Sequence, residues 1–198
     1  MPKTLKTSIG DIQIRDYFDE KVAEEVIEQH LYEHWGEIKL SGNVIDLGAH
    51  IGTFSALALF NGCSVTAVEP SPSSFSLLKI NAPNATLINK AVSNQKQVFL
   101  AEYERSELNM VSDHGILVDC VTLDELIDKP VDVLKIDIEG SEYDVLYSCS
   151  KLDMIAQITM EYHHGLKKLG KLLVFLENKG FKFGWIGGQD FGHLQVKK

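Results

Sequence analysis

Several short apolar runs in the sequence end in acidic residues, and these carboxylates are its first candidates for chemistry. Asp46 ends one run, Glu69 ends a second, and Asp137 and Glu139 end a third. In open α/β sheets, ligands bind outside the carboxyl ends of the strands. If the three runs are parallel strands of one sheet, their carboxylates gather at one binding edge.

A glycine-containing turn follows the first run, in the pattern Asp46-x-Gly48-x-x-x-Gly52. Glycines in such a turn let backbone N–H groups approach a nucleotide-like ligand closely. A dinucleotide fingerprint would need glycine where His50 and Thr53 stand, and a Walker A loop would need a lysine after Gly52. A carboxylate here repels a pyrophosphate but suits an ammonium or sulfonium charge, and S-adenosylmethionine carries both. The alternative is a capping aspartate and a tight turn that binds no ligand.

The second carboxylate favours the nucleotide-like ligand. Glu69 follows Asp46 at close to the roughly 20-residue spacing at which an acidic residue accepts hydrogen bonds from ribose hydroxyls. We therefore expect Glu69, which is followed by Pro70 and Ser71, to bind a ribose. The alternative is an exposed loop carboxylate.

The third run carries two carboxylates that strand alternation would place on one face, Asp137 and Glu139. Such a pair repels, so at least one member should have a raised pKa or a cation partner. This suits a general base or a metal ligand. The alternative is that these carboxylates only stabilise the N-terminus of the next helix through its dipole. This alternative is strongest for Glu142.

A fourth run ends with Glu161 and His163 on one face. We expect it beside Asp137 if sequential strands are neighbours in the sheet. The ordinary pKa of histidine suits His163 to accept a substrate proton. With Asp137 and Glu139 it could instead form an oxygen and nitrogen metal set. The third alternative is a merely structural histidine.

These residues are positioned by β-rich runs that alternate with amphipathic segments, which predicts a mostly parallel sheet with helices on both faces. Pro72 and possible capping boxes at Thr122 and Ser141 mark helix starts. The expected strands are 43–47, 64–69, 86–89, 131–138 and 155–162, and the expected helices are 53–61, 73–81, 141–149 and 166–179.

Three regions depart from this alternation. Residues 1–40 contain an alternating segment at 8–15 and an expected helix at 19–34, with Val22, Val26, Ile27 and Leu31 on one stripe. We interpret them as an N-terminal cap on a domain of residues 41–198. Residues 93–121 predict an antiparallel excursion with strands 97–101 and 116–121, and the segments 181–186 and 191–196 predict a hairpin that closes one sheet edge. Acceptor specificity is expected from residues 1–40 and 93–121.

Composition and charge exclude several classes of protein. Apolar residues make up 44 % and charged residues 24 % of the 198 residues, as in folded globular domains. The net charge of −9 repels nucleic-acid phosphates and anionic lipids, and no run approaches the roughly 20 apolar residues of a membrane span. Cys63, Cys120 and Cys149 form no paired motif. We therefore expect a cytoplasmic protein without a nucleic-acid or membrane partner.

Other residues receive structural interpretations. Tyr32, Trp35 and Phe54 are interpreted as core aromatics, and His30 and His34 lack an acidic partner placed as in the H-E-x-x-H motif of zinc-binding helices. The sequence has no Gly-x-Ser-x-Gly nucleophile elbow, which disfavours a serine hydrolase.

Taken together, the motifs resemble the FkbM-type family of S-adenosylmethionine-dependent methyltransferases. The resemblance spans about residues 41–165, and its most specific block is Asp137-Ile138-Glu139-Gly140-Ser141-Glu142 combined with Glu69-Pro70-Ser71. The other matching segments are 44–52, 89–93, 122–126 and 161–163. The family usually has Asn where this chain has His50.

The resemblance implies a class I methyltransferase fold, which is a Rossmann-like, doubly wound, seven-stranded sheet with its last strand antiparallel. It also implies O-methylation of a hydroxyl on a sugar, polyketide or similar small molecule. By carry-over, the methionine end of the cofactor would lie against Asp46, Gly48, Ala49, His50, Ile51 and Gly52. Glu69, Pro70 and Ser71 would hold the ribose, Ala91 and Val92 the adenine side, and Asp137, Glu139 and His163 would face the transferred methyl, with Asp137 also touching the cofactor.

An alcohol is a poor nucleophile until its proton leaves, so the enzyme must supply a base or a metal to take up the charge. We expect general-base assistance by Asp137 or His163, and a divalent metal is the second choice. Three other classes remain: a non-catalytic binding protein with a cofactor pocket, a nucleic-acid methyltransferase, and a nicotinamide-dependent reductase that binds NAD(P)H.

Overall fold

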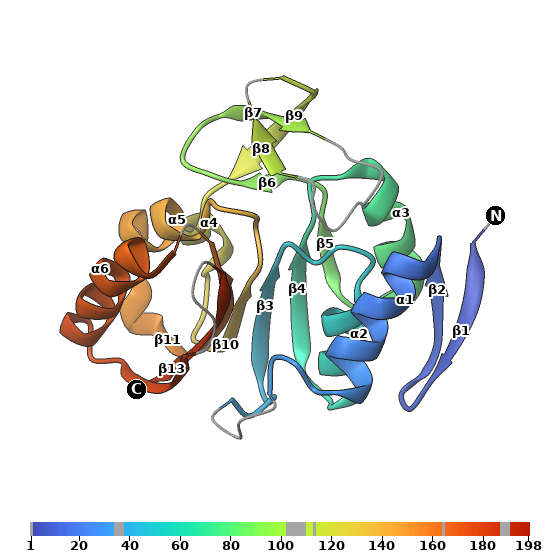
Figure 1. The fold of residues 1–198 in the computed structure, drawn as a ribbon, viewed down its shortest axis with the longest axis horizontal. Helices are drawn as coiled ribbons and strands as arrows, with labels where there is room; N and C mark the ends of the chain where they lie inside the picture. The colour runs from blue at the N-terminus through green and yellow to red at the C-terminus, as the bar shows by residue number, and fades with distance from the viewer. Residues whose placement is uncertain (1, 34–37, 102–109, 113, 164, 187–190) are drawn as a thin grey trace.

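The computed structural model describes residues 2–33, 38–101, 110–112, 114–163, 165–186 and 191–198. Its main element is a seven-stranded sheet in the order β12-β13-β11-β10-β3-β4-β5 (Figure 1). Strands β11, β10, β3, β4 and β5 are parallel, and β13 is antiparallel to both of its neighbours. The bounds are β3 Asn43–Leu47, β4 Ser64–Val68, β5 Thr86–Ile88, β10 Val131–Ile136, β11 Ile155–Tyr162, β12 Lys182–Ile186 and β13 Gly192–Lys197.

Helices cover both faces of this sheet, because its strands place alternate apolar residues on opposite sides. Ile45 and Leu47 belong to one buried cluster, whereas Val44 belongs to the other. The first cluster includes α4 (Leu123–Leu126), α5 (Glu142–Ser148) and α6 (Gly165–Asn178), and the second includes α2 (Thr53–Phe60) and α3 (Pro72–Asn81). The predicted doubly wound α/β fold is thus confirmed.

Several element ends differ from the expected ones by one or two residues, and two differences concern the segment around Asp137 and the expected helix caps. Strand β10 ends at Ile136 rather than at residue 138, so Asp137 and Glu139 stand in the turn beyond it. The capping box at Thr122 is confirmed, but Ser141 makes no side-chain cap. Glu142 accepts a hydrogen bond from the Gly140 N–H there instead, at 2.8 Å.

A second, four-stranded sheet in the order β6-β9-β7-β8 stands at one end of the main sheet (Figure 1). It consists of β6 Ala91–Val92, β7 Gln97–Ala101, β8 Met110–Ser112 and β9 Ile116–Val121. The pair β7 and β9 is antiparallel, with Phe99 opposite Leu117. The predicted antiparallel excursion is confirmed, and the short strands β6 and β8 are additions that the sequence did not indicate.

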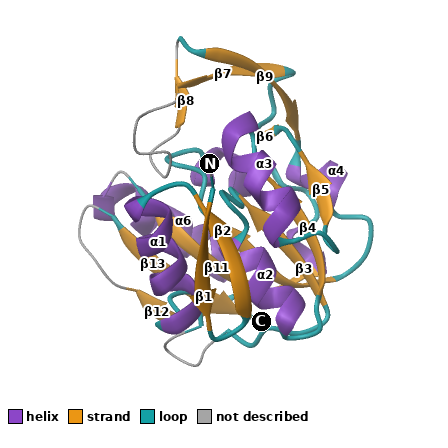
Figure 2. Cartoon of the chain, turned by 90° about the vertical axis from the view of Figure 1, so that its right-hand side faces the viewer, coloured by secondary structure: helices purple, strands orange, loops and turns teal. Residues whose placement is uncertain are grey.

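The N-terminal region is a hairpin of β1 (Lys3–Thr7) and β2 (Gly10–Ile14), followed by helix α1 (Tyr17–Ala23) and a π-helical turn, η1 (Glu24–Glu28). Figure 2 shows the hairpin in front of the helices. The single helix expected over 19–34 is wrong, because Asp16 caps α1 at Phe18 and Asp19 and the helical segment ends at Glu28. His34 and Trp35 lie outside the described residues. The apolar stripe does pack into the core, through buried Val26 and Ile27.

The C-terminal hairpin is confirmed, and its last strand, β13, inserts between β11 and the edge strand β12. Within the described ranges, no helix has the length and apolar character needed to cross a membrane.

Candidate active site

A pocket opens at the carboxyl ends of β3, β4 and β10. Nine of the site residues predicted from the sequence line it: Gly48, Ala49, His50, Glu69, Pro70, Ala91, Val92, Asp137 and Glu139. Its other lining residues are Val22, Val26, Tyr32, Thr53, Phe54, Val68, Leu100, Lys135, Ile138 and Ser141. Five predicted site residues are absent from the lining, namely Asp46, Ile51, Gly52, Ser71 and His163. The pocket is therefore shared by the main sheet, the N-terminal region and the small sheet.

The turn after β3 depends on Gly48, which has a φ of +74°. A Cβ atom built on Gly48 would lie 1.7 Å from the Asp137 carbonyl oxygen. The Gly48 N–H also donates to the Val68 carbonyl at 3.0 Å. Only a residue without a side chain lets β3, β4 and β10 meet this closely.

Replacing Gly48 by alanine is therefore expected to prevent folding or to lower the free energy of unfolding by several kcal/mol, on the order of the largest single-residue effects. Urea unfolding followed by circular dichroism measures this. Gly170→Ala is the matched control, because nothing lies within 4 Å of its added Cβ. Gly170 is in a helix, so that change should stabilise the protein by up to about 1 kcal/mol. A stable Gly48→Ala variant would contradict the close approach.

Asp46 lies behind the pocket wall rather than in it. Its carboxylate is fully buried, accepts a hydrogen bond from the Ser55 hydroxyl at 2.7 Å, and lies 3.2 Å from the Lys135 ammonium. The Asp46 side chain is absent from the pocket lining. Its charge instead holds Lys135 under the glycine turn.

Glu69 does face the pocket, and two backbone amides orient its carboxylate. The Ser71 N–H donates to Oε1 and the His50 N–H to Oε2, both at 2.8 Å. Burial raises the pKa of Glu69 to about 7, although these backbone hydrogen bonds act in the opposite direction. Each oxygen keeps a second lone pair that can accept a hydrogen bond from a ligand hydroxyl.

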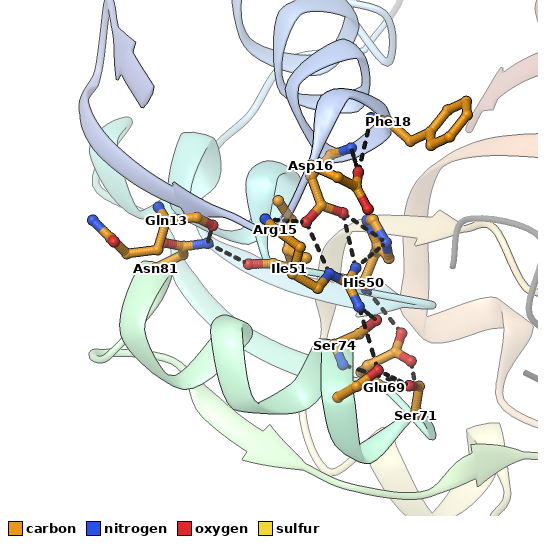
Figure 3. Close-up of polar contacts among 12 residues, drawn as sticks. Gln13, Arg15, Asp16, Phe18, His50, Ile51, Glu69, Ser71, Ser74 and Asn81 are labelled. Atoms are coloured by element: carbon orange, nitrogen blue, oxygen red, sulfur yellow. Dashed lines mark hydrogen bonds and ion pairs between the residues drawn. The ribbon is translucent and has the colours of Figure 1, made fainter. Parts of the chain in front are cut away.

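His50 is held against the N-terminal region (Figure 3). Its Nε2 atom lies 2.9 Å from the Arg15 guanidinium and 3.5 Å from the Asp19 carboxylate. Burial lowers the pKa of His50 to about 4, and the charge of Arg15 also lowers it, against the opposite effect of Asp19. The ring is thus neutral at neutral pH and can accept a hydrogen bond from Arg15.

This neutral histidine makes stability depend on pH. The folded pKa of about 4 is below the ordinary histidine value of 6.5, so the unfolded chain binds more protons between these values. The contribution of His50 is full above pH 6.5 and is lost as the pH falls toward 4. Between pH 7 and pH 5 we expect wild type to lose about 2 kcal/mol more unfolding free energy than His50→Asn, measured in urea. Parallel pH dependence of the two proteins would contradict the buried neutral ring.

Asp137 lies in the pocket beside two residues that the sequence interpretation missed. The Tyr32 hydroxyl donates to Asp137 Oδ2 at 2.8 Å, and the Lys135 ammonium lies 3.7 Å from the same oxygen. Lys135 could have been noticed as a lone charge inside an apolar strand run. Tyr32 carried no such signal, because its place beside Asp137 depends on contacts of its backbone carbonyl with Thr159 and Gln195.

His163 lies between two carboxylates instead of facing the pocket. Its Nδ1 atom is 2.9 Å from Glu142 and its Nε2 atom is 3.3 Å from Glu139. Burial lowers the pKa of His163, but the hydrogen bond with Glu142 and the surrounding carboxylates outweigh it and raise the pKa above its usual range. A histidine that is already protonated at neutral pH cannot accept a substrate proton. This geometry argues against His163 as the general base.

At least one of Asp137 and Glu139 was expected to have a raised pKa or a cation partner, and both have a cation beside them, Lys135 and His163 respectively. The metal set considered for Asp137, Glu139 and His163 does not form. Among the described residues, no group of three or more histidine, cysteine or carboxylate side chains is arranged to hold a metal ion.

The chain is similar to known methyltransferases in sequence and in fold. The family model for the methyltransferase FkbM domain matches residues 46–183. A methyltransferase FkbM from Methylobacillus flagellatus KT is 17 % identical, with a TM-score of 0.54 over 92 % of this chain and 56 % of that chain. No curated protein sequence matches this chain significantly.

Two further solved structures share the fold. A precorrin-6y C5,15-methyltransferase from Geobacter metallireducens GS-15 is 16 % identical, with a TM-score of 0.50 over 83 % of this chain and 84 % of that chain. A protein described as a candidate rRNA methylase, from Clostridium thermocellum, is 12 % identical, with a TM-score of 0.50 over 93 % of this chain and 99 % of that chain. At these identities the likeness concerns the fold alone.

The sheet order and the pocket at its carboxyl edge define a class I methyltransferase fold. The chain belongs to the FkbM methyltransferase domain family, and it is an S-adenosylmethionine-dependent methyltransferase. The pocket fits that cationic cofactor, because it is lined by the carboxylates of Glu69, Asp137 and Glu139 and by the close backbone turn at Gly48.

Proposed function

We propose that this enzyme methylates a hydroxyl group of a small molecule, with Asp137 as the general base. The observation that carries the proposal is the Asp137 carboxylate in the pocket lining, with Tyr32 fixing one of its oxygens. A hydroxyl is a weak nucleophile until its proton leaves, and a positioned carboxylate can accept that proton.

The cofactor site would be formed by the residues around the glycine turn. Glu69 would accept hydrogen bonds from the ribose hydroxyls, and Ala91 and Val92 would contact the adenine side. The methionine end would lie near Gly48, Ala49 and His50. When bound, S-adenosylmethionine supplies an electrophilic methyl group on a sulfonium. Asp137 would take the proton of the acceptor hydroxyl as that oxygen bonds to the methyl carbon and displaces S-adenosylhomocysteine, whose sulfur keeps the electron pair of the broken S–CH3 bond.

The charge of the pocket favours an uncharged acceptor. Its described lining contains three carboxylates, from Glu69, Asp137 and Glu139, and one ammonium, from Lys135. Lys135 is already 3.2 Å from Asp46. Such a site repels phosphate groups, which disfavours a nucleic-acid acceptor.

We further propose that residues 1–40 act as a cap that helps to select the acceptor. Val22, Val26 and Tyr32 of this region line the pocket, as does Leu100 of β7. These side chains, together with Phe54, give the pocket apolar walls that suit the carbon skeleton of a small hydroxylated molecule.

Thermal unfolding with S-adenosylhomocysteine, S-adenosylmethionine, NAD⁺ and NADPH tests the cofactor site. An adenosyl ligand at 100 times its Kd should add about 2.7 kcal/mol, which raises Tm by roughly 5–10 °C. Incubation with radiolabelled S-adenosylmethionine and separate pools of sugars, hydroxylated polyketides and RNA tests the acceptor. Label in a hydroxylated small molecule supports the proposal. Label in RNA alone, or cofactor binding without transfer to any pool, would overturn it.

A further inference from the structure

We propose that Arg15, Asp19 and His50 form a positioning relay that holds Glu69 toward the cofactor ribose. The N-terminal region would thereby set the affinity of the enzyme for its cofactor. This inference rests on the ribose role of Glu69 that the proposed function assigns. The relay links three elements that are far apart in the sequence and adjacent in the fold (Figure 3).

The relay begins with the two amides that bind Glu69. One is the N–H of His50, and the other is the N–H of Ser71 just before helix α3. Glu69 is only 6 % exposed, so the direction of its carboxylate follows from the positions of these two amides. A small shift of either amide would turn the carboxylate away from a ligand hydroxyl.

The amide of His50 needs support because its backbone is strained. Its φ is +52°, in the left-handed region that only a few per cent of residues other than glycine adopt, although histidine, asparagine and aspartate are the most frequent among them. Strain of this kind persists only where surrounding contacts hold the residue in place. The contact of His50 Nε2 with the Arg15 guanidinium, at 2.9 Å, supplies such support.

Arg15 is in turn fixed by Asp19. The guanidinium donates to both carboxylate oxygens of Asp19, from Nε and Nη2, each at 2.8 Å. Asp19 is fully buried, and it also accepts the Arg15 backbone N–H at 2.7 Å. A bidentate pair of this geometry has little freedom to rotate.

Arg15 also reaches the element that carries the second amide. Its Nη1 atom lies 3.3 Å from the Ser73 hydroxyl and 3.2 Å from the Ser74 hydroxyl, both in the first turn of α3. The Ser74 N–H donates to the side chain of Ser71, the residue whose amide binds Glu69 Oε1. The Arg15 guanidinium thus contacts both segments whose amides bind Glu69, namely the turn that carries His50 and the start of α3.

A second tie between the same elements provides a structural control. The Asn81 amide donates to the Gln13 carbonyl at 2.9 Å and to the Ile51 carbonyl at 2.7 Å, which joins β2 to the turn without contacting Glu69 (Figure 3). Asn81→Ser should loosen the N-terminal hairpin and leave the relay intact. Comparison with Asn81→Ser therefore distinguishes an effect on the orientation of Glu69 from an effect of loosening the N-terminal hairpin.

The first test is a double-mutant cycle on the Kd of S-adenosylhomocysteine, measured by titration calorimetry without acceptor. Arg15→Lys keeps a cation beside Asp19, but it cannot contact His50 and Ser74 together. We expect it to raise Kd about tenfold in wild type and less than twofold in Glu69→Gln. His50→Leu should also raise Kd about tenfold, whereas His50→Asn should stay within about threefold, because asparagine tolerates positive φ and can accept from Arg15.

The second test asks whether the effect is located at the ribose. Adenosine and 2′-deoxyadenosine are compared as competitors of bound S-adenosylhomocysteine. Wild type and Asn81→Ser should prefer adenosine, and the preference should shrink toward unity in Arg15→Lys and in Glu69→Gln. The relay would be overturned if Arg15→Lys raised the Kd of S-adenosylhomocysteine equally in wild type and in Glu69→Gln, or did not raise it in a folded protein. Loss of the preference for adenosine in Asn81→Ser would overturn it too. Because neither measurement uses an acceptor, these results are independent of whether the proposed hydroxyl methylation is correct.

Discussion

Replacing Asp137 by asparagine is expected to lower kcat by about 10²- to 10⁴-fold, the range that a positioned general base contributes. Asparagine has nearly the same shape and can still accept a hydrogen bond from the Tyr32 hydroxyl, which lies 2.8 Å from Asp137 Oδ2. It cannot take up the proton of an acceptor hydroxyl. The chemical step should therefore suffer far more than the affinity for S-adenosylhomocysteine.

Rates of methyl transfer under single-turnover conditions, together with calorimetric Kd values, check this expectation. Asp128→Asn is a matched control at an exposed position outside the pocket lining, and it should leave both values unchanged. Tyr32→Phe keeps the carboxylate and removes one hydrogen bond to it, so we expect a smaller loss of roughly 5-fold. Full turnover by a folded Asp137→Asn variant with normal cofactor binding would exclude both general-base and metal assistance at this residue.

The elements that carry the carboxylates could be predicted closely because their signals are local. The strands expected at 43–47 and 155–162 coincide with β3 and β11, and the strands expected at 97–101 and 116–121 coincide with β7 and β9. Period-two alternation and turn residues act within a few positions of the chain, so they can be read without knowledge of the fold. The placement of Glu69, Asp137 and Glu139 at one pocket follows from parallel order alone.

The residues that orient these carboxylates could not be predicted in the same way. Tyr32 contacts Asp137 across more than a hundred positions of sequence, and Arg15 contacts His50 from a different element. The role expected for His163 illustrates the same limit. Its ordinary pKa suggested a proton acceptor, but Glu139 and Glu142 lie on either side of it and raise that pKa. Such effects depend on tertiary contacts, which local sequence patterns do not encode.

Lys135→Met is expected to lower the free energy of unfolding by about 3–5 kcal/mol, the usual cost of removing one partner from a buried ion pair. The Lys135 side chain is 4 % exposed, and its ammonium lies 3.2 Å from the fully buried Asp46 carboxylate. Burial lowers the pKa of Lys135, but the charges of Asp46 and Asp137 outweigh it and raise the pKa. The variant would leave the Asp46 charge buried without its cation.

Urea unfolding at neutral pH measures this cost, with Lys129→Met as the control at an exposed lysine. Adding Asp46→Asn to Lys135→Met removes the uncompensated charge, so the double variant should recover at least half of the lost stability. A cost below about 1 kcal/mol for Lys135→Met would contradict the buried pair. Lys135 also donates to the Gly48 carbonyl at 2.7 Å. The double variant has no uncompensated charge, but the Gly48 carbonyl has still lost the hydrogen bond from Lys135. We therefore expect the double variant to bind S-adenosylhomocysteine more weakly than wild type.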